Sequence, residues 1–223
     1  MAMMDTQLAT RQLVAALESS EVSVRLAAAL GAGCDPHPDY VETLVERCAV
    51  EPDFFVRDML SWALIRNDRA AVTDRLLAEL TSATPQARSQ ALHTLSKVGD
   101  PAVWPAITSD LLFDADDDVA RAAWRTAAGL VPEASRGQLA ADLATQLGRG
   151  GREVRLSLSR ALVLLGDAAL PVLARAVAST DEVVRAHAAA TLRLIEDPDA
   201  AFDDAVQEAT RVRTLRGAPL VGG

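Results

Sequence analysis

The most reactive side chains of this sequence lie close together near its N-terminal end. Cys34 and His37 stand three residues apart in Cys-Asp-Pro-His, and Cys48 follows one predicted helix later. Two thiols and an imidazole are ligands that Zn²⁺ accepts, and a cysteine with a histidine can supply a nucleophile and its base. Zinc sites usually carry two closely spaced ligand pairs, however, and only one pair is present here. We therefore expect no metal and no catalytic residue, with Cys34 in a turn and Cys48 half-buried; a three-ligand metal site or a reactive thiol is the alternative.

The motifs of several large enzyme classes are absent from the sequence. There is no Gly-rich phosphate loop, no His-Glu-x-x-His zinc motif and no Gly-x-Ser-x-Gly nucleophile motif. The sequence therefore predicts a protein that is not an enzyme and carries no cofactor.

Aromatic residues gather in one short region and make a candidate binding patch. Tyr40, Phe54, Phe55 and Trp62 are half of the aromatic residues in the chain. Aromatic side chains bury a large area at low rotamer cost, so they often anchor ligands. The alternative is that Phe55 and Trp62 pack between helices while Phe54 and Tyr40 cover a turn.

An arginine recurs along the chain at intervals of 32, 31, 33, 34 and 30 residues. The six positions are Arg25, Arg57, Arg88, Arg121, Arg155 and Arg185. A period in this range is typical of a solenoid, whose units bury their apolar faces by stacking. We interpret the arginines as structural: each guanidinium is expected to bind an acidic residue or a helix-end carbonyl of the adjacent unit and so hold the repeats in register.

The positions one before, three after and seven after each arginine are apolar, which is the pattern of one face of a helix. Four positions before it, acidic or small residues such as Asp53, Asp117 and Asp181 predict the start of that helix. Each first helix ends at Gly, Asn, Asp or Pro residues, and a second helix follows. The second helices are predicted at residues 39–49, 70–80, 102–112, 134–147, 168–178 and 200–213. An additional amphipathic helix at 6–18 is a candidate N-terminal cap.

With these motifs the chain resembles the short HEAT repeats of bacterial proteins, including those of the phycobilisome-lyase type. The resemblance rests on Asp181-Glu-Val-Val-Arg185, on Glu153-Val-Arg155 running to Gly166-Asp167, and on Ala87-Arg88 running to Gly99-Asp100. It implies an all-α fold, a right-handed α-solenoid of about six helix-pair repeats. We expect one domain over residues 1–213 and a disordered tail over 214–223. Because the second helices of such solenoids typically line the concave side, Asp74, Arg75, Trp104 and Asp110 are further candidates for a binding surface.

The net charge of −9 argues against a protein that binds mainly by neutralising phosphates, so nucleic acid is an unlikely partner. An acidic surface favours partners of basic or mixed charge. No apolar stretch approaches the length of a membrane span, and no secretory signal is present, so we expect a cytoplasmic, monomeric protein without membrane contact. The acidic run from Asp114 to Asp118 is interpreted as the negative N-terminal cap of a helix.

The leading functional hypothesis is a non-enzymatic binding or scaffold protein that presents a concave helical surface to a protein, peptide or small molecule. Two alternatives come from the repeat type. The first is a HEAT-like DNA glycosylase acting on alkylated bases, for which Trp104, Asp110, Trp124 and Arg125 offer suitable side chains. The second is a tetrapyrrole lyase-like protein, for which no particular residue argues.

Overall fold

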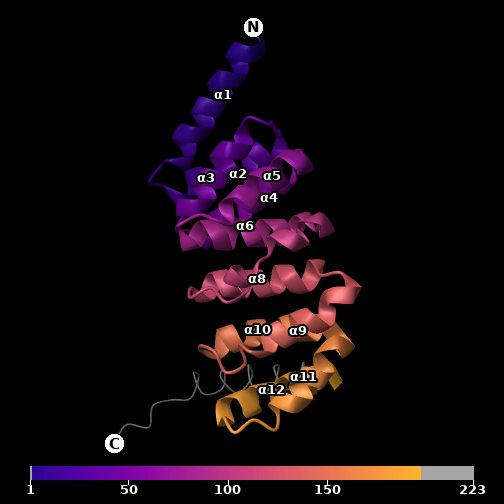
Figure 1. Ribbon diagram of the computed structural model, residues 1–223. Helices are drawn as coiled ribbons and strands as arrows, with labels where there is room; N and C mark the ends of the chain where they lie inside the picture. Colours follow the sequence, from indigo (N-terminus) through magenta and orange to yellow (C-terminus); the bar gives the residue numbers. More distant parts are fainter. Residues whose placement is uncertain (1, 197–223) are drawn as a thin grey trace, which may run out of the picture. The chain divides into compact units, whose positions relative to one another are not determined.

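The computed structural model describes residues 2–196, with side chains from residue 7 on, and every element in this part of the chain is helical (Figure 1). The all-α prediction is confirmed. The predicted second helix at 200–213 and the predicted tail at 214–223 lie outside the described residues. The chain divides into two compact units, Met1–Leu139 and Ala140–Gly223, which are described separately. The prediction of a single domain stays a prediction.

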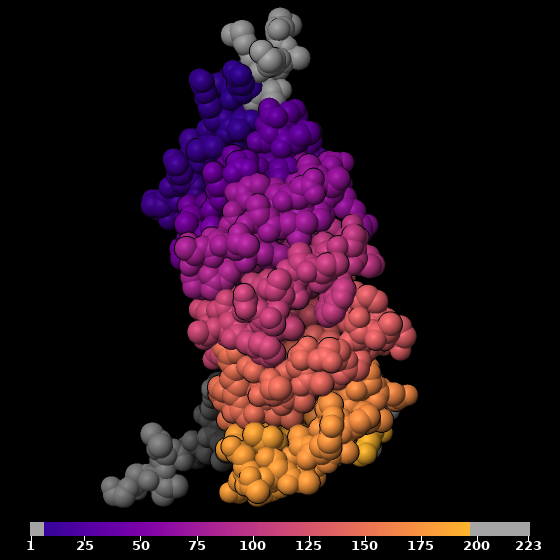
Figure 2. Space-filling view, in the orientation of Figure 1, coloured from indigo at the N-terminus to yellow at the C-terminus, as the bar shows by residue number. Residues whose placement is uncertain are grey.

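Helices alternate along the first unit, and each long first helix is followed by shorter helical pieces (Figure 1). Figure 2 shows the surface of the molecule in the same orientation. The elements of this unit are α1 (Ala2–Leu17), α2 (Val22–Cys34), α3 (Tyr40–Val50), α4 (Phe54–Ile65), α5 (Arg69–Glu79), α6 (Pro85–Val98), η1 (Pro101–Ala106), α7 (Ser109–Leu112), α8 (Asp117–Leu130) and η2 (Glu133–Ser135). The division between the units falls within α9 (Arg136–Ala144). The second unit contains α10 (Arg152–Leu165), η3 (Gly166–Ala169), α11 (Leu170–Ala176) and α12 (Glu182–Glu196).

The second helices match the prediction in position but differ in continuity. The first two are α3 and α5, each displaced by one residue from the predicted range. In the third, fourth and fifth, a short 3₁₀ turn precedes the α-helical part, as in η1 before α7. Pro105 lies inside η1 and cannot donate a backbone hydrogen bond, which explains why a regular α-helix does not form there. The predicted cap at 6–18 corresponds to α1.

Aspartate side chains fix the helix starts. The Asp53 carboxylate accepts hydrogen bonds from the backbone N–H groups of Phe55 and Val56, at 2.9 and 3.0 Å, and Asp68 and Asp100 cap α5 and η1 in the same way. These bonds satisfy N–H groups that have no partner inside the helix. Of the three aspartates predicted at first-helix starts, Asp53 and Asp181 cap their helices, whereas Asp116 caps α8 in place of Asp117.

The first helices of the first unit stack on one another, α2 on α4, α4 on α6 and α6 on α8. The column three residues after the arginines is buried in α4, α6 and α8, where Leu60, Ala91 and Trp124 are 0–2% exposed. Trp124 donates its indole N–H to the carbonyl oxygen of Leu112 at 2.8 Å. In α4, α6 and α8 the core thus follows the apolar columns that the sequence predicted, whereas in α2 Val24 of the column before the arginines is 42% exposed.

Four of the six repeated arginines make the same hydrogen bond. One terminal N–H of the guanidinium donates to the carbonyl oxygen six residues earlier, in the turn before the helix; the distances are 2.7–2.9 Å. The donors are Arg25, Arg57, Arg88 and Arg185. Each arginine therefore ties its own helix to the end of the preceding helix pair, which agrees with the structural role expected of this column.

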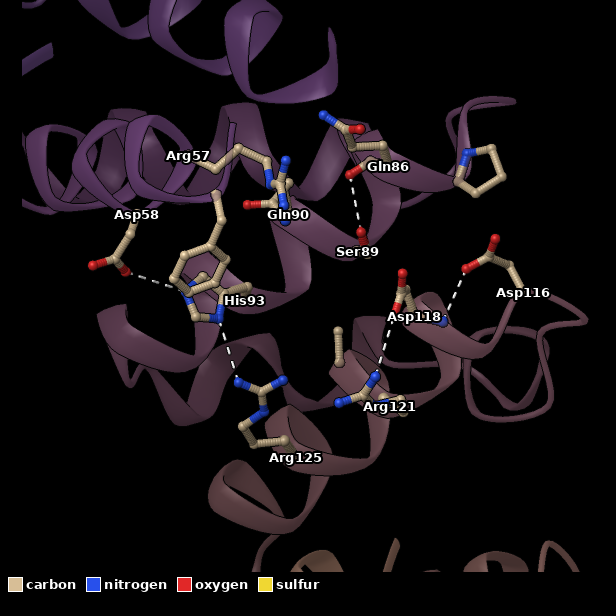
Figure 3. Close-up of a pocket in the computed structure, with 13 residues that line it drawn as sticks. Arg57, Asp58, Gln86, Ser89, Gln90, His93, Asp116, Asp118, Arg121 and Arg125 are labelled. Atoms are coloured by element: carbon tan, nitrogen blue, oxygen red, sulfur yellow. Dashed lines mark hydrogen bonds and ion pairs between the residues drawn. The ribbon is translucent and has the colours of Figure 1, made fainter. Parts of the chain in front are cut away.

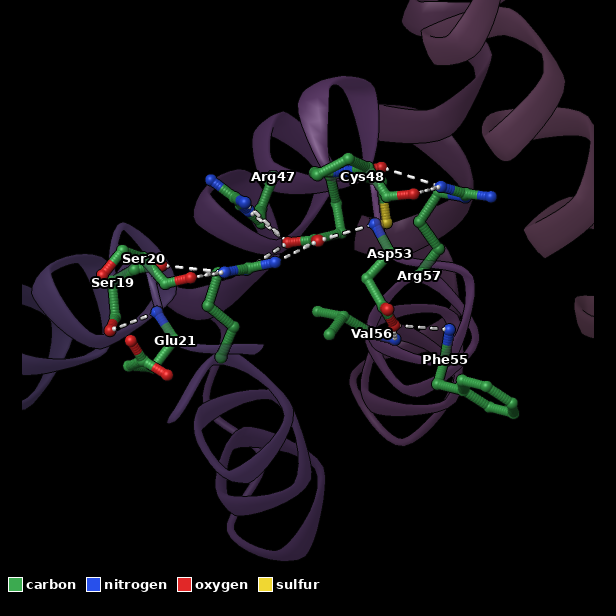
Figure 4. A network of polar contacts seen from close by, with 12 residues as sticks. Ser19, Ser20, Glu21, Arg47, Cys48, Asp53, Phe55, Val56 and Arg57 are labelled. Carbon is green, nitrogen blue, oxygen red and sulfur yellow. Dashed lines mark hydrogen bonds and ion pairs between the residues drawn. The ribbon is translucent and has the colours of Figure 1, made fainter. Parts of the chain in front are cut away.

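Glu51 is the centre of a polar cluster in the first unit. Figure 4 shows this cluster, with Arg47 and Asp53 among the labelled residues. Its side chain is 0% exposed and accepts two hydrogen bonds from Arg25, at 2.8 and 2.9 Å, others from Arg47, and one from the backbone N–H of Asp53. Burial acts to raise the pKa of this carboxyl, but the bonds from Arg25, Asp53 N–H and Arg47 outweigh it and lower the pKa to about 2. The cluster fastens α2, α3 and the start of α4 together.

In the second unit a buried histidine joins α10 and α12. His187 is 6% exposed, and its Nδ1 accepts a hydrogen bond from the backbone N–H of Gly148 at 3.0 Å. Its Nε2 lies 3.0 Å from the carbonyl oxygen of Arg155 and 3.1 Å from the hydroxyl of Ser159. Because Nδ1 accepts, the proton of the neutral ring sits on Nε2 and can be donated. Burial lowers the pKa of His187, which favours this neutral form.

One helical stretch, Arg152–Ala176, is long and apolar enough to cross a membrane by length and composition, although the sequence had suggested no such segment. In the structure the chain turns within it at Gly166, whose φ of 58° and ψ of −132° separate α10 from η3 and α11. Leu162 and Leu173 of this stretch are 0% exposed, so part of its apolar surface belongs to the core of the second unit.

Candidate functional site

A cavity of the first unit lies on the first helices α4, α6 and α8 and has a volume of about 620 Å³ (Figure 3). Its walls are mainly polar. The lining residues are Phe54, Arg57, Asp58, Pro85, Gln86, Ser89, Gln90, His93, Asp116, Asp118, Arg121, Ala122 and Arg125. The sequence had placed part of the expected binding surface, Asp74, Arg75, Trp104 and Asp110, on the second helices. This cavity lies instead on the first helices, where the predicted Phe54 is also found.

A step of 32 residues relates the cavity residues of the three helices. It takes Arg57 to Ser89 and Arg121, and it likewise takes Asp58 to Gln90 and Ala122. Two further rows are Phe54, Gln86 and Asp118, and His93 and Arg125. Within each helix these positions are separated by three or four residues and so share one face. The cavity is therefore the same face of three successive repeats, with a different side chain at each step.

Arg121 lines the cavity, as Arg57 does, but it lacks the hydrogen bond to the carbonyl oxygen six residues earlier that Arg57 makes. Arg57 and Arg88 stand four residues after their N-caps, Asp53 and Thr84, but Arg121 stands five residues after Asp116. The sequence had placed this helix start at Asp117; the structure shows that Asp116 is the cap, accepting from the N–H groups of the second and third residues after it. One extra residue rotates a side chain by about 100° around a helix. Arg121 was predicted to bind a helix-end carbonyl in a structural role, and this prediction is wrong. Its side chain lies in the cavity wall.

The guanidinium groups of the cavity are only partly neutralised. Arg57 donates to two carbonyl oxygens, of Glu51 and Pro52, and makes no ion pair with a carboxylate within residues 7–196. Arg121 has one long contact, 3.4 Å, with the carboxylate of Asp118, and its buried Nε has no hydrogen-bond partner. Both side chains thus retain N–H donors for a ligand.

The carboxylates near the cavity are already engaged elsewhere. Asp58 forms an ion pair with Lys97 at 2.7 Å, and this bond lowers the pKa of the Asp58 carboxyl. Asp116 accepts the two backbone bonds that cap α8. Asp118 is the exception, because its carboxylate lines the cavity, is 79% exposed and has one long contact, 3.4 Å, with Arg121. The cavity therefore offers guanidinium groups and neutral polar groups to a ligand, together with one exposed carboxylate.

His93 lies in the cavity as a neutral hydrogen-bonding group. Its Nδ1 is 3.4 Å from a terminal nitrogen of Arg125, and its Nε2 is 3.9 Å from the carboxylate of Asp58 (Figure 3). Burial, aided by the charges of Lys97 and Arg125, lowers the pKa of His93 to about 4. The imidazole is uncharged near neutral pH, and the charge of the cavity then comes from the arginines.

Of the predicted aromatic patch, only Phe54 lines the cavity. Phe54 and Phe55 are 64% and 70% exposed, and their rings meet edge to face at 5.6 Å. The alternative in which Phe55 packs between helices is wrong. Trp62 is half-buried and its ring lies against Gly33 of α2, so it packs between two first helices. Tyr40 contacts the ring of His37 at the start of α3.

The other predicted site residues do not join this cavity. Arg75 of α5 is held by Glu42 and Glu79, each at 2.6 Å, so its charge is already matched. Asp74 and Asp110 are exposed, and Trp104 is half-buried in η1. The structure does not bring these four together with the aromatic pair in one cavity.

The cysteines do not form a reactive centre with His37. Burial raises the pKa of the Cys48 thiol to about 12, whereas Cys34 is exposed at the end of α2. His37 accepts a hydrogen bond at Nδ1 from the backbone N–H of Asp39. Within the part of the chain that the structure describes, no three histidine, cysteine or acidic side chains are grouped as metal ligands would be.

The residues suggested for a glycosylase are also separated. Trp124 is 0% exposed and hydrogen-bonded to Leu112, which leaves no face of its ring for a base. Of the four residues considered, only Arg125 lines the cavity. The geometry gives no support to a pocket for a damaged base.

Comparison with known proteins finds solved structures of similar fold, but it assigns the chain to no family. No protein-family model matches the chain, and no curated protein matches it by sequence. Among solved structures, the complex of CpcE and CpcF of phycocyanin lyase from Nostoc sp. PCC7120 is 19% identical, with a TM-score of 0.47; the match covers 83% of this chain and 76% of that one. An engineered protein is 21% identical, with a TM-score of 0.45 over 84% of this chain and 96% of that one. At these values the likeness assigns no activity and no residue role to this chain.

The expectation that the chain is not an enzyme is nevertheless corrected. One of the solved structures that it resembles is that of a phycocyanin lyase, which is an enzyme. Helical repeats of this kind are therefore compatible with catalysis, and missing motifs were not sufficient reason to exclude it.

Proposed function

We propose that this chain is a helical-repeat binding protein whose cavity on α4, α6 and α8 holds an acidic segment of a partner protein. The observation that carries the proposal is the pair Arg57 and Arg121, which line one cavity and keep guanidinium N–H donors without a full carboxylate partner. Arginine forms paired, charge-assisted hydrogen bonds with carboxylates, and these are among the stronger polar contacts in proteins.

The positive charge of the two cavity arginines is opposite in sign to the net charge of the whole chain, on which the expected class of partner was based. The net charge of −9 suggested a basic or mixed partner. Charges more than about 8 Å away are largely screened at physiological ionic strength, so the groups in the cavity wall decide what binds there. A carboxylate-bearing segment fits the arginines, and the exposed ring of Phe54 at the rim offers apolar contact beside them.

Several finer features predicted from the sequence remain part of this proposal. They are a right-handed solenoid of about six repeats, a cytoplasmic and monomeric protein, and a partner that is neither nucleic acid nor membrane. Size-exclusion chromatography with light scattering tests the monomer, and low-salt titration with labelled duplex DNA tests the exclusion of nucleic acid.

A binding titration tests the proposed function. We would measure by fluorescence polarisation the affinity of the full chain for a labelled glutamate-rich peptide and for its glutamine counterpart. Arg57→Gln and Arg121→Gln should each weaken binding of the glutamate peptide by about 10-fold or more, since a hydrogen bond to a charged group contributes about 1.5–3 kcal/mol. Arg69→Gln is the matched control, because it removes an exposed charge of the same unit outside the cavity. Equal affinity for both peptides, or equal effects of all three variants, would contradict the proposal.

A further inference from the structure

We infer that the cavity recognises two carboxylates on one extended peptide, separated by about five or six residues, with the Gln90 amide bound to the peptide backbone between them. This inference rests on the proposed function and names the pattern that the partner must carry. It depends on the order of side chains along the 32-residue step: arginine on α4, neutral residues on α6 and arginine on α8.

The middle helix of the cavity presents no positive charge because its own ladder arginine is neutralised. Arg88 donates to the carbonyl oxygen of Ser82 at 2.7 Å and forms an ion pair with Asp114 at 2.9 Å. Arg88 does not line the cavity, and Ser89 and Gln90 stand there in its place. The cavity wall therefore runs from charged to neutral to charged across three repeats.

Gln90 is the polar group of α6 best suited to a peptide backbone. Gln86 already donates its side-chain amide to the carbonyl oxygens of Cys48 and Glu51, and Ser89 donates its hydroxyl to the carbonyl oxygen of Gln86. The Gln90 side chain makes no hydrogen bond within residues 7–196 and lies in the cavity near Arg57 (Figure 3). Its amide has both donors and an acceptor, which are the groups that a peptide N–H and C=O require.

The separation of the two arginines sets the spacing of the carboxylates. Arg57 and Arg121 lie on α4 and α8, two packed helices apart. Packed helices are about 8–10 Å apart, so the axes of α4 and α8 are separated by roughly 16–20 Å. An extended chain advances about 3.3 Å per residue, which gives roughly five or six residues between the two acidic side chains. Both contacts then form on one segment without bending it.

A peptide series tests this spacing. Each labelled peptide would carry two glutamates separated by two to eight positions in a neutral Ser/Thr background, and affinity for the full chain would be measured by fluorescence polarisation. We expect the tightest binding at a separation of five or six, at least 10-fold tighter than at a separation of two. Arg121→Gln should lower the affinity of the best peptide to that of a single-glutamate peptide. Gln90→Ala should weaken the whole series by a similar factor.

The outcomes separate this inference from the proposed function. If all two-glutamate peptides bind equally and all depend on Arg57 and Arg121, the cavity binds acidic segments and the spacing rule is wrong. If no peptide binds, both are wrong. Thermal melting of Arg121→Gln and Gln90→Ala confirms that each variant is folded, so that a loss of binding reports on the cavity.

Discussion

If the first helices stack as the structure shows, replacing Gly31 or Gly33 of α2 by alanine should change the free energy of unfolding in opposite directions. Gly31 has no heavy atom within 4 Å of an added Cβ. At Gly33 the added Cβ would lie 2.5 Å from Cε3 of the Trp62 ring and 3.0 Å from Cα of Ala63. A normal carbon–carbon contact is about 3.5–4.0 Å, so the ring or the helix must move by about 1 Å.

The expected difference in the free energy of unfolding between the two variants follows from two known effects. Replacing glycine by alanine inside a helix stabilises a protein by about 0.5–1 kcal/mol, and this gain applies to both sites. Overpacking a filled contact costs about 1–3 kcal/mol, and this cost applies to Gly33 alone. The free energy of unfolding of Gly33→Ala should therefore be about 1–3 kcal/mol lower than that of Gly31→Ala, a difference in Tm of roughly 2–4 °C for each kcal/mol in a chain of this length.

Urea denaturation followed by circular dichroism measures this difference in the full chain. In a Trp62→Leu background the penalty at Gly33 should largely disappear, because the overlapping ring is gone. Equal effects of Gly31→Ala and Gly33→Ala, or an unchanged penalty in the Trp62→Leu background, would refute the packing of α4 on α2.

Three further predictions concern charged and titratable groups. The folded-state pKa of Glu51, about 2, lies below its ordinary value of 4.5, so its stabilising effect is complete above pH 4.5 and is lost as the pH falls toward 2; Glu51→Gln should flatten the urea stability profile in this range. The pKa of His187 is also lowered, so its contribution is complete above pH 6.5 and decreases as the pH falls below that value; His187→Gln should remove this decrease in the same urea titration. Arg88→Ala should lower the melting temperature more than Arg121→Ala, because Arg88 has a carbonyl and a carboxylate partner while Arg121 has one long ion pair; equal shifts would show that both belong to the ladder.

The repeat made much of the fold predictable. A period near 32 residues, apolar columns and acidic helix starts are local signals, and the structure has the corresponding helices, buried columns and caps. The role of Arg25, Arg57, Arg88 and Arg185 was predicted for the same reason, since each donates to the turn before its helix. Arg155 stands four positions after the N-cap Gly151 and makes no such bond within the described residues. Arg121 differs because its cap is Asp116 rather than Asp117, and within a run of aspartates the sequence does not distinguish the two.

The candidate site was much less predictable. Phe54 was the only predicted binding residue that lines the cavity, while Arg57 and Arg121 had been assigned to the scaffold. The sequence does contain a pattern that marks the cavity, because polar residues recur at a step of 32 beside the apolar columns. Polar positions on a helix are usually solvated surface, however, and only the stacking of three helices shows that these ones enclose a shared space.

The most direct test of the central claim is to locate a bound acidic peptide on the helix pairs. A photo-crosslinking amino acid would replace Gln90 in the cavity or, in a second variant, Asp74 on α5, and each full chain would be irradiated with the labelled two-glutamate peptide. If the first-helix cavity is the binding site, the peptide should be crosslinked from position 90, be displaced by unlabelled peptide, and be absent from position 74. Crosslinking from position 74 without crosslinking from position 90 would contradict the account and return the binding surface to the second helices.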